Sequence, residues 1–226
     1  IQGGGVSQQV LASSVCQFGA IPAEITGHTG GYGGFRFSPE QAPCLYGGLT
    51  YATVFTSMFL HGSWLHLIGN MWFLWLFGNN VEDSMGHIRY LAFYLLGGAL
   101  AGAAHIFVNA NSLVPTVGAS GAISAVMGAY LVLYPRVRVH TLFILFIFIK
   151  IIPIPAWLVL GEYLAIQVLN GAMAGSAAGG VAVFAHIGGF VAGALLVKLF
   201  ENRTLVAARK QHLQLSSYEI KHRGWW

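Results

Sequence analysis

Charged side chains are scarce in this chain. Lys and Arg number 11 and Asp and Glu number 7, so 8% of the 226 residues are charged, against roughly 25% in a soluble domain. No charged residue occurs in three long stretches, 41–81, 90–135 and 163–197. Each stretch is long enough for one or two membrane helices of about 20 apolar residues. The scarcity of charge excludes a soluble globular domain and a disordered chain, and predicts an all-α polytopic membrane protein.

Clustered basic residues and metal-binding cysteine pairs are also missing. The net charge is +4, but the basic residues form no patch, so no nucleic-acid partner is expected. Cys16 and Cys44 lack a CxxC or His-paired spacing, which argues against a metal site built on them. Both precede the first apolar stretch, where they form a disulfide or remain free thiols.

The apolar stretches divide into five predicted membrane spans. Residues 1–52 are rich in Gly, Ser and Pro, and are expected to be an external segment before the first span. Lys150, Pro153 and Pro155 interrupt residues 139–170, so residues 141–152 are expected to be interfacial or re-entrant. The predicted spans are about 53–77, 90–108, 120–134, 156–170 and 181–200. A membrane core of 53–200 and a cytoplasmic tail of 201–226 follow from these boundaries.

The positions of the basic residues predict the orientation of the spans. If the loop with Arg89 is cytoplasmic, Arg36 is the single basic residue left outside. The loops 1–50, 109–119 and 171–180 are then external, and the expected location is a plasma (inner) membrane. An in-to-out helix must precede residue 53. Because the chain starts at Ile1 without a signal-like segment, we expect that helix upstream of this sequence.

Two groups of neutral polar residues lie inside the predicted spans, where polar side chains often mark function. His66 and Asn70 are four residues apart, so both point from one face of their helix. Ser120 lies between Gly118 and Gly121 at the start of a span, where free backbone amides can hold an anion. Interhelical hydrogen bonds explain a single buried His or Asn equally well, and a GxSG string alone is weak evidence.

The third place with a polar side chain inside a span is His186, near the external end of the last span. Gly189 and Gly193 follow it and form a GxxxG face. The helix of Ser120 carries a matching stripe of small residues, Ser124 and Gly128. Close approach of the two helices is expected to bring His186 within reach of the Ser120 hydroxyl. Plain GxxxG packing explains the glycines and leaves the histidine unexplained.

Together these residues have the chemistry that acyl transfer needs: a nucleophile, a general base and oxyanion donors. No Asp or Glu is positioned to orient His186, so a Ser–His dyad is predicted instead of a triad. Glu162 is the only acid within a span. We favour a structural, bundle-facing role for it over a role in a water path.

At these residues the sequence resembles the rhomboid family of intramembrane serine proteases. The motifs are His61-(x)4-His66-(x)3-Asn70, Gly118-Ala-Ser-Gly121 and Ala185-His-Ile-Gly-Gly-Phe-Val-Ala-Gly193. The resemblance implies a six-helix bundle, of which the first helix is missing here, with a cavity open to the outer side. By resemblance Ser120 is the nucleophile, His186 is the base, and His66, Asn70 and the Ser120 amide form the oxyanion hole. His61, Gly118, Gly121, Gly189 and Gly193 would support the cavity.

The resemblance also implies a reaction: cleavage of transmembrane segments of other membrane proteins, in the lipid bilayer and without a cofactor or metal, often after small side chains. The sequence departs from the family at Ser124, where many members carry an aromatic residue that packs under the base. Two alternatives stay open. A catalytically inactive relative would only bind membrane clients, and a transporter or metal-binding protein would use His61, His66 and His186 while leaving Ser120 without a role.

Overall fold

The computed structural model describes residues 8–29, 34–35, 44–45, 50–145, 148–174 and 182–207. Parts of the predicted Gly-rich segment, the loop 171–180 and the tail beyond residue 207 therefore lie outside the described residues, as does Arg36. The helices are α1 (Gln8–Phe18), α2 (Pro22–Ile25), α3 (Thr53–Thr56), η1 (Ser57–Phe59), α4 (Trp64–Phe73), η2 (Leu74–Gly78), α5 (Asn79–Met85), α6 (His87–Val108), α7 (Ser120–Leu133), α8 (Ala156–Ala174) and α9 (Val183–Phe200). Two antiparallel strand pairs are β1 (Gly34–Phe35) with β2 (Cys44–Leu45), and β3 (Arg138–Leu145) with β4 (Phe148–Pro155).

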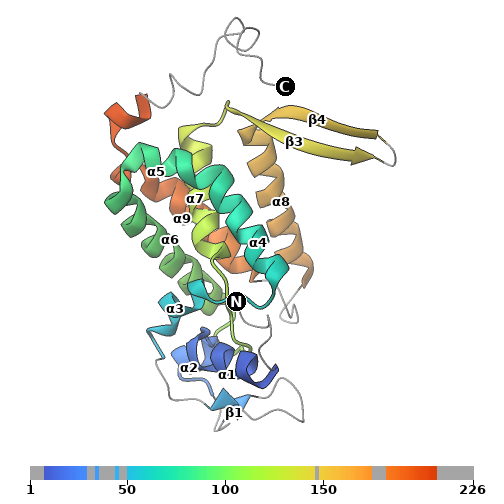
Figure 1. The fold of residues 1–226 in the computed structure, drawn as a ribbon. Coiled ribbons are helices and arrows are strands. Elements are labelled where there is room, and N and C mark those ends of the chain that lie inside the picture. Colours follow the sequence, from blue (N-terminus) through green and yellow to red (C-terminus); the bar gives the residue numbers. More distant parts are fainter. Residues whose placement is uncertain are drawn as a thin grey trace, which may run out of the picture.

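Three of the described helices, α6, α8 and α9, are long and apolar enough to cross a membrane. A shorter apolar helix, α7, lies between them (Figure 1). These four helices agree with the predicted spans 90–108, 120–134, 156–170 and 181–200 to within a few residues. The chain is a mostly helical, multi-pass membrane protein.

The first predicted span, 53–77, was placed wrongly. Residues 53–59 form the separate short helices α3 and η1, and the long helix begins only at Trp64. Ser63 is extended and its hydroxyl accepts a hydrogen bond from the His66 amide, which is an N-cap. The helix then continues without a break through the π-helical turn η2 and α5, until Gly86 with φ of 83° turns the chain. The predicted span ended at residue 77 because the residues that follow Gly78 are mostly polar. Polar residues mark the end of the apolar layer, but the helix itself continues through α5.

The prediction of an all-α fold is confirmed only in part: the described residues are mostly helical, but residues 138–145 and 148–155 pair as the antiparallel strands β3 and β4 of a hairpin. Its register pairs Arg138 with Pro155 and Leu145 with Phe148. Figure 1 shows the hairpin extending sideways from the end of α8, across the direction of that helix. This segment contains six Ile and three Phe residues, which favour strands.

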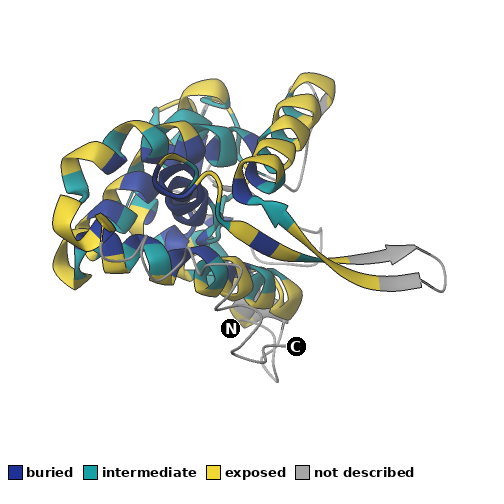
Figure 2. Cartoon of the chain, turned by 90° about the horizontal axis from the view of Figure 1, so that it is seen from above, coloured by how far each residue is buried: buried dark blue, intermediate teal, exposed yellow. Residues whose placement is uncertain are grey.

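Helix α7 lies at the centre of the bundle. Eleven of its 14 residues are buried, including Ser124 and Tyr130, and it packs against α6, α8 and α9. Figure 2 shows the buried residues gathered in the middle, with exposed residues on the outward faces. Glu162 is one of the exposed residues of α8, so the prediction that it faces the bundle is wrong. A central helix buried on all sides holds the residues at its first turn in a fixed place.

The N-terminal segment packs under the loop between α6 and α7. Ala20 and Thr116 exchange two backbone hydrogen bonds, and the Ala23 amide donates to the Ser112 carbonyl. A disulfide joins Cys16 to Cys44, with 5.2 Å between their Cα atoms. The structure thus favours the disulfide over free thiols. It also places the N-terminal segment and the loop 109–119 at one end of the bundle (Figure 1), as the predicted orientation requires.

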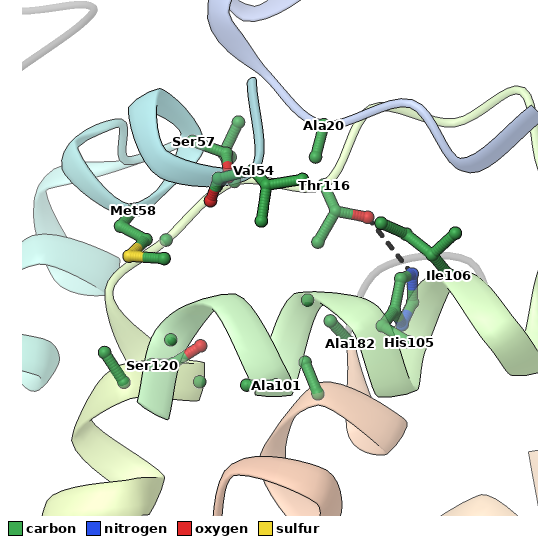
Figure 3. Close-up of a pocket in the computed structure, with 17 residues that line it drawn as sticks. Ala20, Val54, Ser57, Met58, Ala101, His105, Ile106, Thr116, Ser120 and Ala182 are labelled. Carbon is green, nitrogen blue, oxygen red and sulfur yellow. Dashed lines mark hydrogen bonds between the residues drawn. The ribbon is translucent and has the colours of Figure 1, made fainter. Parts of the chain in front are cut away.

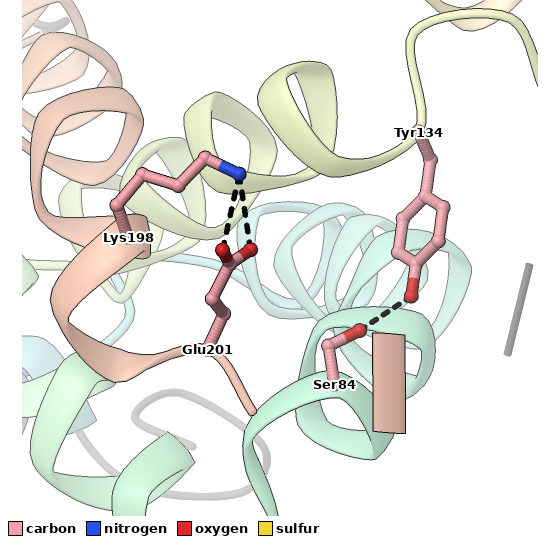
Figure 4. Close-up of polar contacts among 4 residues, drawn as sticks. All are labelled: Ser84, Tyr134, Lys198 and Glu201. Carbon is pink, nitrogen blue, oxygen red and sulfur yellow. Dashed lines mark hydrogen bonds and ion pairs between the residues drawn. The ribbon is translucent and has the colours of Figure 1, made fainter. Parts of the chain in front are cut away.

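At the opposite end, a buried hydroxyl pair joins α5 to the end of α7. The Ser84 hydroxyl bonds Tyr134 Oη and donates to the Asn80 carbonyl, and both side chains are almost fully buried. Figure 4 shows this pair beside the Lys198–Glu201 ion pair at the end of α9. The Lys198 side chain is 59% exposed and that of Glu201 is 9% exposed, so the ion pair lies at the edge of the bundle.

Replacing Tyr134 with Phe should lower the free energy of unfolding by about 1–2 kcal/mol, because the buried Ser84 oxygen loses a partner. Unfolding in detergent micelles with increasing SDS, followed by tryptophan fluorescence, measures the change. Tyr51→Phe is the matched control, since Tyr51 is 75% exposed and should change stability by less than about 0.5 kcal/mol. Equal stabilities for the two variants would contradict the role of the pair.

Candidate functional site

Ser120 is the first residue of α7, at the end of the bundle against which the N-terminal segment packs. Gly118, two residues earlier, has φ of 129°, in a region that favours glycine. Its amide donates to the Ser57 carbonyl at 2.9 Å, which ties the turn to η1. A Cβ at Gly118 would lie 2.8 Å from the ring Nε2 of His66. The glycine therefore lets the turn before Ser120 lie directly against His66.

The structure brings Ser120 and His186 together. His186 Nε2 on α9 lies 2.8 Å from Ser120 Oγ on α7, although the two residues are 66 positions apart. The hydroxyl can donate to the ring nitrogen in this geometry, which is the arrangement of a serine with its general base.

Glycines make the close approach of α7 and α9 possible. A Cβ on Gly189 would lie 2.2 Å from the Gly121 carbonyl oxygen, and one on Gly193 would lie 1.9 Å from that of Ala125. On α7, a Cβ on Gly128 would lie 2.0 Å from the Phe190 carbonyl oxygen. Of the predicted stripe, Gly128 lies in the interface, where Gly121 joins it, whereas the Ser124 side chain bonds Tyr163 of α8.

His66 and Asn70 lie on α4, on the same side of Ser120. Asn70 is buried, and no described side-chain or backbone group lies within hydrogen-bond distance of its Nδ2. An unpaired buried amide donor is costly unless a ligand satisfies it. His61 packs edge-on against His66, with 5.2 Å between ring centroids. It lines a neighbouring cavity between α4 and α6, and not the one that Ser120 and His186 share.

A cavity of about 490 Å³ joins these side chains. Polar groups from four helices line it: His66 and Asn70 from α4, Ser120 from α7, Tyr163 from α8 and His186 from α9. The remaining lining is apolar, including Leu65 and Phe73. A mostly apolar cavity with a few convergent polar groups is typical of a binding or catalytic site.

Two residues of α8 complete the site and were not identified from the sequence. Gln167 Oε1 lies 2.9 Å from His186 Nδ1. Tyr163 Oη lies 2.7 Å from Ser124 Oγ, and the Tyr163 ring is tilted beside the His186 ring, with 6.4 Å between centroids. An aromatic ring from another helix thus lies beside His186, whereas Ser124 on α7 offers none.

A second, small cavity of about 40 Å³ lies behind Ser120, between α3, α6 and α7. It has room for about two or three water molecules. Figure 3 shows His105 and Thr116 on its wall, joined by a hydrogen bond of 3.1 Å. Ser120 lines both cavities.

Within the described residues, no group of three or more His, Cys, Asp or Glu side chains could hold a metal ion. His61, His66 and His186 therefore do not form a metal site in this part of the chain. The arrangement of a hydroxyl, an imidazole and an amide donor around a cavity instead supports acyl transfer.

Comparison with known families identifies the fold. The model of the rhomboid domain matches residues 49–203, more than half of the chain. The chain belongs to the rhomboid family. The match covers α3 through α9 and includes Ser120, His186 and the α4 residues of the site.

Several curated rhomboid proteins resemble the chain. Rhomboid protein 1, mitochondrial, of Saccharomyces cerevisiae is 30% identical over 168 residues, covering 72% of this chain and 45% of the yeast protein. RHOMBOID-like protein 12, mitochondrial, of Arabidopsis thaliana is 34% identical over 128 residues, covering 50% of this chain and 36% of the relative. Presenilin-associated rhomboid-like protein, mitochondrial, of Homo sapiens is 32% identical over 90 residues, covering 39% and 24%. The chain thus spans less than half the length of these relatives.

Proposed function

We propose that this rhomboid protein is a serine protease that hydrolyses peptide bonds in or near the transmembrane segments of other membrane proteins. The observation that carries the proposal is the 2.8 Å contact between Ser120 Oγ and His186 Nε2. It lies in a cavity that the unpaired amide of Asn70 also lines. No cofactor is needed for this chemistry.

In the first step, Ser120 Oγ attacks the carbonyl carbon of the scissile bond while His186 Nε2 accepts the hydroxyl proton. The carbonyl oxygen becomes an oxyanion. When the tetrahedral intermediate collapses, the C–N bond breaks and the imidazolium gives its proton to the leaving amine. Water, activated by His186, then hydrolyses the acyl-enzyme, which restores the Ser120 hydroxyl and releases the carboxylate.

We assign three donors to the stabilisation of the oxyanion. Asn70 Nδ2 has no described partner, and His66 lines the same cavity. The Ser120 amide is the first of α7, and the first amides of a helix have no acceptor within the helix. Removing one such donor typically costs a factor of 10²–10³ in rate.

The proposed substrates are membrane proteins, and the resemblance to the rhomboid family implies cleavage after small side chains of their transmembrane segments. The cavity lies at the outer end of α7 and is lined by groups from four helices, and water must reach it for the second half of the reaction. Apolar residues of α4 and α8 are exposed on the sides of the bundle, among them Trp72 and Trp157. Such surfaces are typical of contact with the lipid bilayer.

The predicted orientation in the membrane is part of the proposal. The active site opens on the non-cytoplasmic side, and the tail after residue 200 lies on the opposite side. The compartment differs from the sequence-based expectation. The relatives from yeast, Arabidopsis and human are all named as mitochondrial, which gives no support to a plasma-membrane location. A mitochondrial membrane is the location that agrees with the names of these relatives. The orientation predicted from the basic residues does not depend on which membrane holds the protein.

Labelling with a fluorophosphonate tests the proposal directly. The reagent should form an adduct at Ser120, located by mass spectrometry of the purified protein in detergent. The His186→Ala variant should lose nearly all labelling, because the hydroxyl then lacks its base. His87→Ala is the matched control, since the His87 side chain is 89% exposed at the start of α6 and far from the site along the helix. Labelling that persists without His186, or that occurs elsewhere, would overturn the proposal.

A further inference from the structure

Helix α8 contacts the site through two polar side chains, although most of its surface faces outward. Its inward residues are Leu160, Tyr163, Leu164 and Gln167, spaced as one face of a helix requires. Gln167 bonds His186 Nδ1 at 2.9 Å, and Tyr163 bonds Ser124 at 2.7 Å. Polar residues on a membrane helix that point into the bundle usually serve a purpose.

The bond to Gln167 determines which nitrogen of His186 can act as a base. A neutral imidazole carries one N–H, and the hydrogen bond of one nitrogen decides the role of the other. If Nδ1–H donates to the Gln167 carbonyl oxygen, Nε2 has a free lone pair facing Ser120 Oγ. In the opposite tautomer Nε2–H would point at Ser120, and His186 could not accept its proton.

The Tyr163 side chain holds the imidazole ring from the side. Its hydroxyl is fixed by Ser124, whose own side chain is fully buried in α7. The ring also lies 6.3 Å from the Phe190 ring. An aromatic ring on one side and a hydrogen bond at Nδ1 together leave His186 little freedom to rotate.

We propose that Gln167 is the positioning residue of this active site. It orients His186, as the Asp orients the His of a Ser–His–Asp triad, and it comes from α8. This inference rests on the proposed function. Gln167 does not line the cavity that Ser120 and His186 share, so its effect reaches the substrate only through His186.

An amide is a neutral orienting group, and a carboxylate at the same place would act differently. The titratable groups that interact with His186 are His66 from α4 and His105 from α6, and Tyr163 lies beside it on α8. No acid is among them in the described part of the chain. A carboxylate placed at residue 167 would therefore meet no competing acid near His186.

The Gln167→Leu variant should have a kcat lowered by about 10- to 100-fold, with a KM within about twofold of the native value. The upper end of this loss in kcat equals the smallest contribution typical of a general base, about 10²–10⁴, because His186 is still present but less well oriented. Gln167→Glu should keep most of the activity, because the carboxylate also accepts from Nδ1–H. It should move the acid limb of the pH–rate profile to higher pH by about one unit or more, since a carboxylate stabilises the imidazolium.

Cleavage of a reporter substrate and the rate of fluorophosphonate labelling at Ser120 measure these effects. Val168→Leu is the control, because Val168 is half exposed on the outward face of α8; its kcat should be unchanged. If Gln167→Leu does not fold, Gln167→Asn, which is one methylene too short to reach Nδ1, replaces it. An unchanged kcat in the Leu or Asn variant, or an unmoved pH profile in the Glu variant, overturns the inference. Absence of labelling in the native protein would instead overturn the proposed function itself.

Discussion

Replacement of Ser120 by Ala is expected to lower kcat for a transmembrane reporter substrate by a factor of at least about 10⁴. The substitution removes Oγ, the atom that attacks the substrate in the proposed mechanism and that lies 2.8 Å from His186 Nε2. The fold should persist, because Ser120 is only partly buried and its hydroxyl bonds a side chain that borders the cavity. Cleavage is measured on gels, with the protein reconstituted in liposomes.

Two comparisons make this result specific. Ser13→Ala changes an exposed serine of α1 and should leave kcat unchanged. The double variant Ser120→Ala/His186→Ala should be no slower than Ser120→Ala alone, because residues that act as a unit are not additive. Cleavage at a native rate by Ser120→Ala would show that another group attacks the substrate. A double variant that is slower still would mean that Ser120 and His186 act independently.

The polar residues of the site could be found in the sequence because the surrounding spans are apolar. Against that background Ser120, His186, His66 and Asn70 stand out, and the helical spacing of the last two already places them on one face. The GxxxG pattern predicted the close approach of α7 and α9, which the structure confirms at Gly189 and Gly193.

The α8 residues could not be assigned in the same way. Gln167 and its partner His186 are on different helices, and nothing in their spacing indicates that they meet. The departure at Ser124 gave a signal that something else must hold the base. Only the packing of α8 on α7 shows that the Tyr163 ring lies beside His186.

Two parts of the fold were misjudged because hydropathy reports the lipid layer and not the secondary structure. The helix that begins at Trp64 runs beyond its apolar portion, through Asn79 and Glu82 to Met85. In residues 138–155, Lys150 and the two prolines indicated an interruption, whereas the many β-branched residues were the better guide to a hairpin.

Replacing Gly193 with Ala should lower the free energy of unfolding by several kcal/mol. The new Cβ would lie 1.9 Å from the Ala125 carbonyl oxygen and 2.6 Å from its Cα, and backbone atoms of a packed helix cannot turn aside as a flexible side chain does. Helices α7 and α9 must therefore separate. Alanine favours a helix over glycine by about 1 kcal/mol, so the loss from the clash must exceed this gain. Unfolding in detergent micelles with increasing SDS measures the difference.

Gly161→Ala is the matched control for this prediction, because no atom lies within 4 Å of the Cβ it would carry on α8. The same substitution should there keep or raise stability by up to about 1 kcal/mol. The two variants thus differ in the sign of the change, and equal stabilities would show that α7 and α9 are not in backbone contact. Separation of the helices also moves His186 away from Ser120, because the two residues lie on opposite sides of this interface. Under conditions where Gly193→Ala remains folded, its kcat should therefore fall as well, whereas Gly161→Ala should cleave the reporter at the native rate.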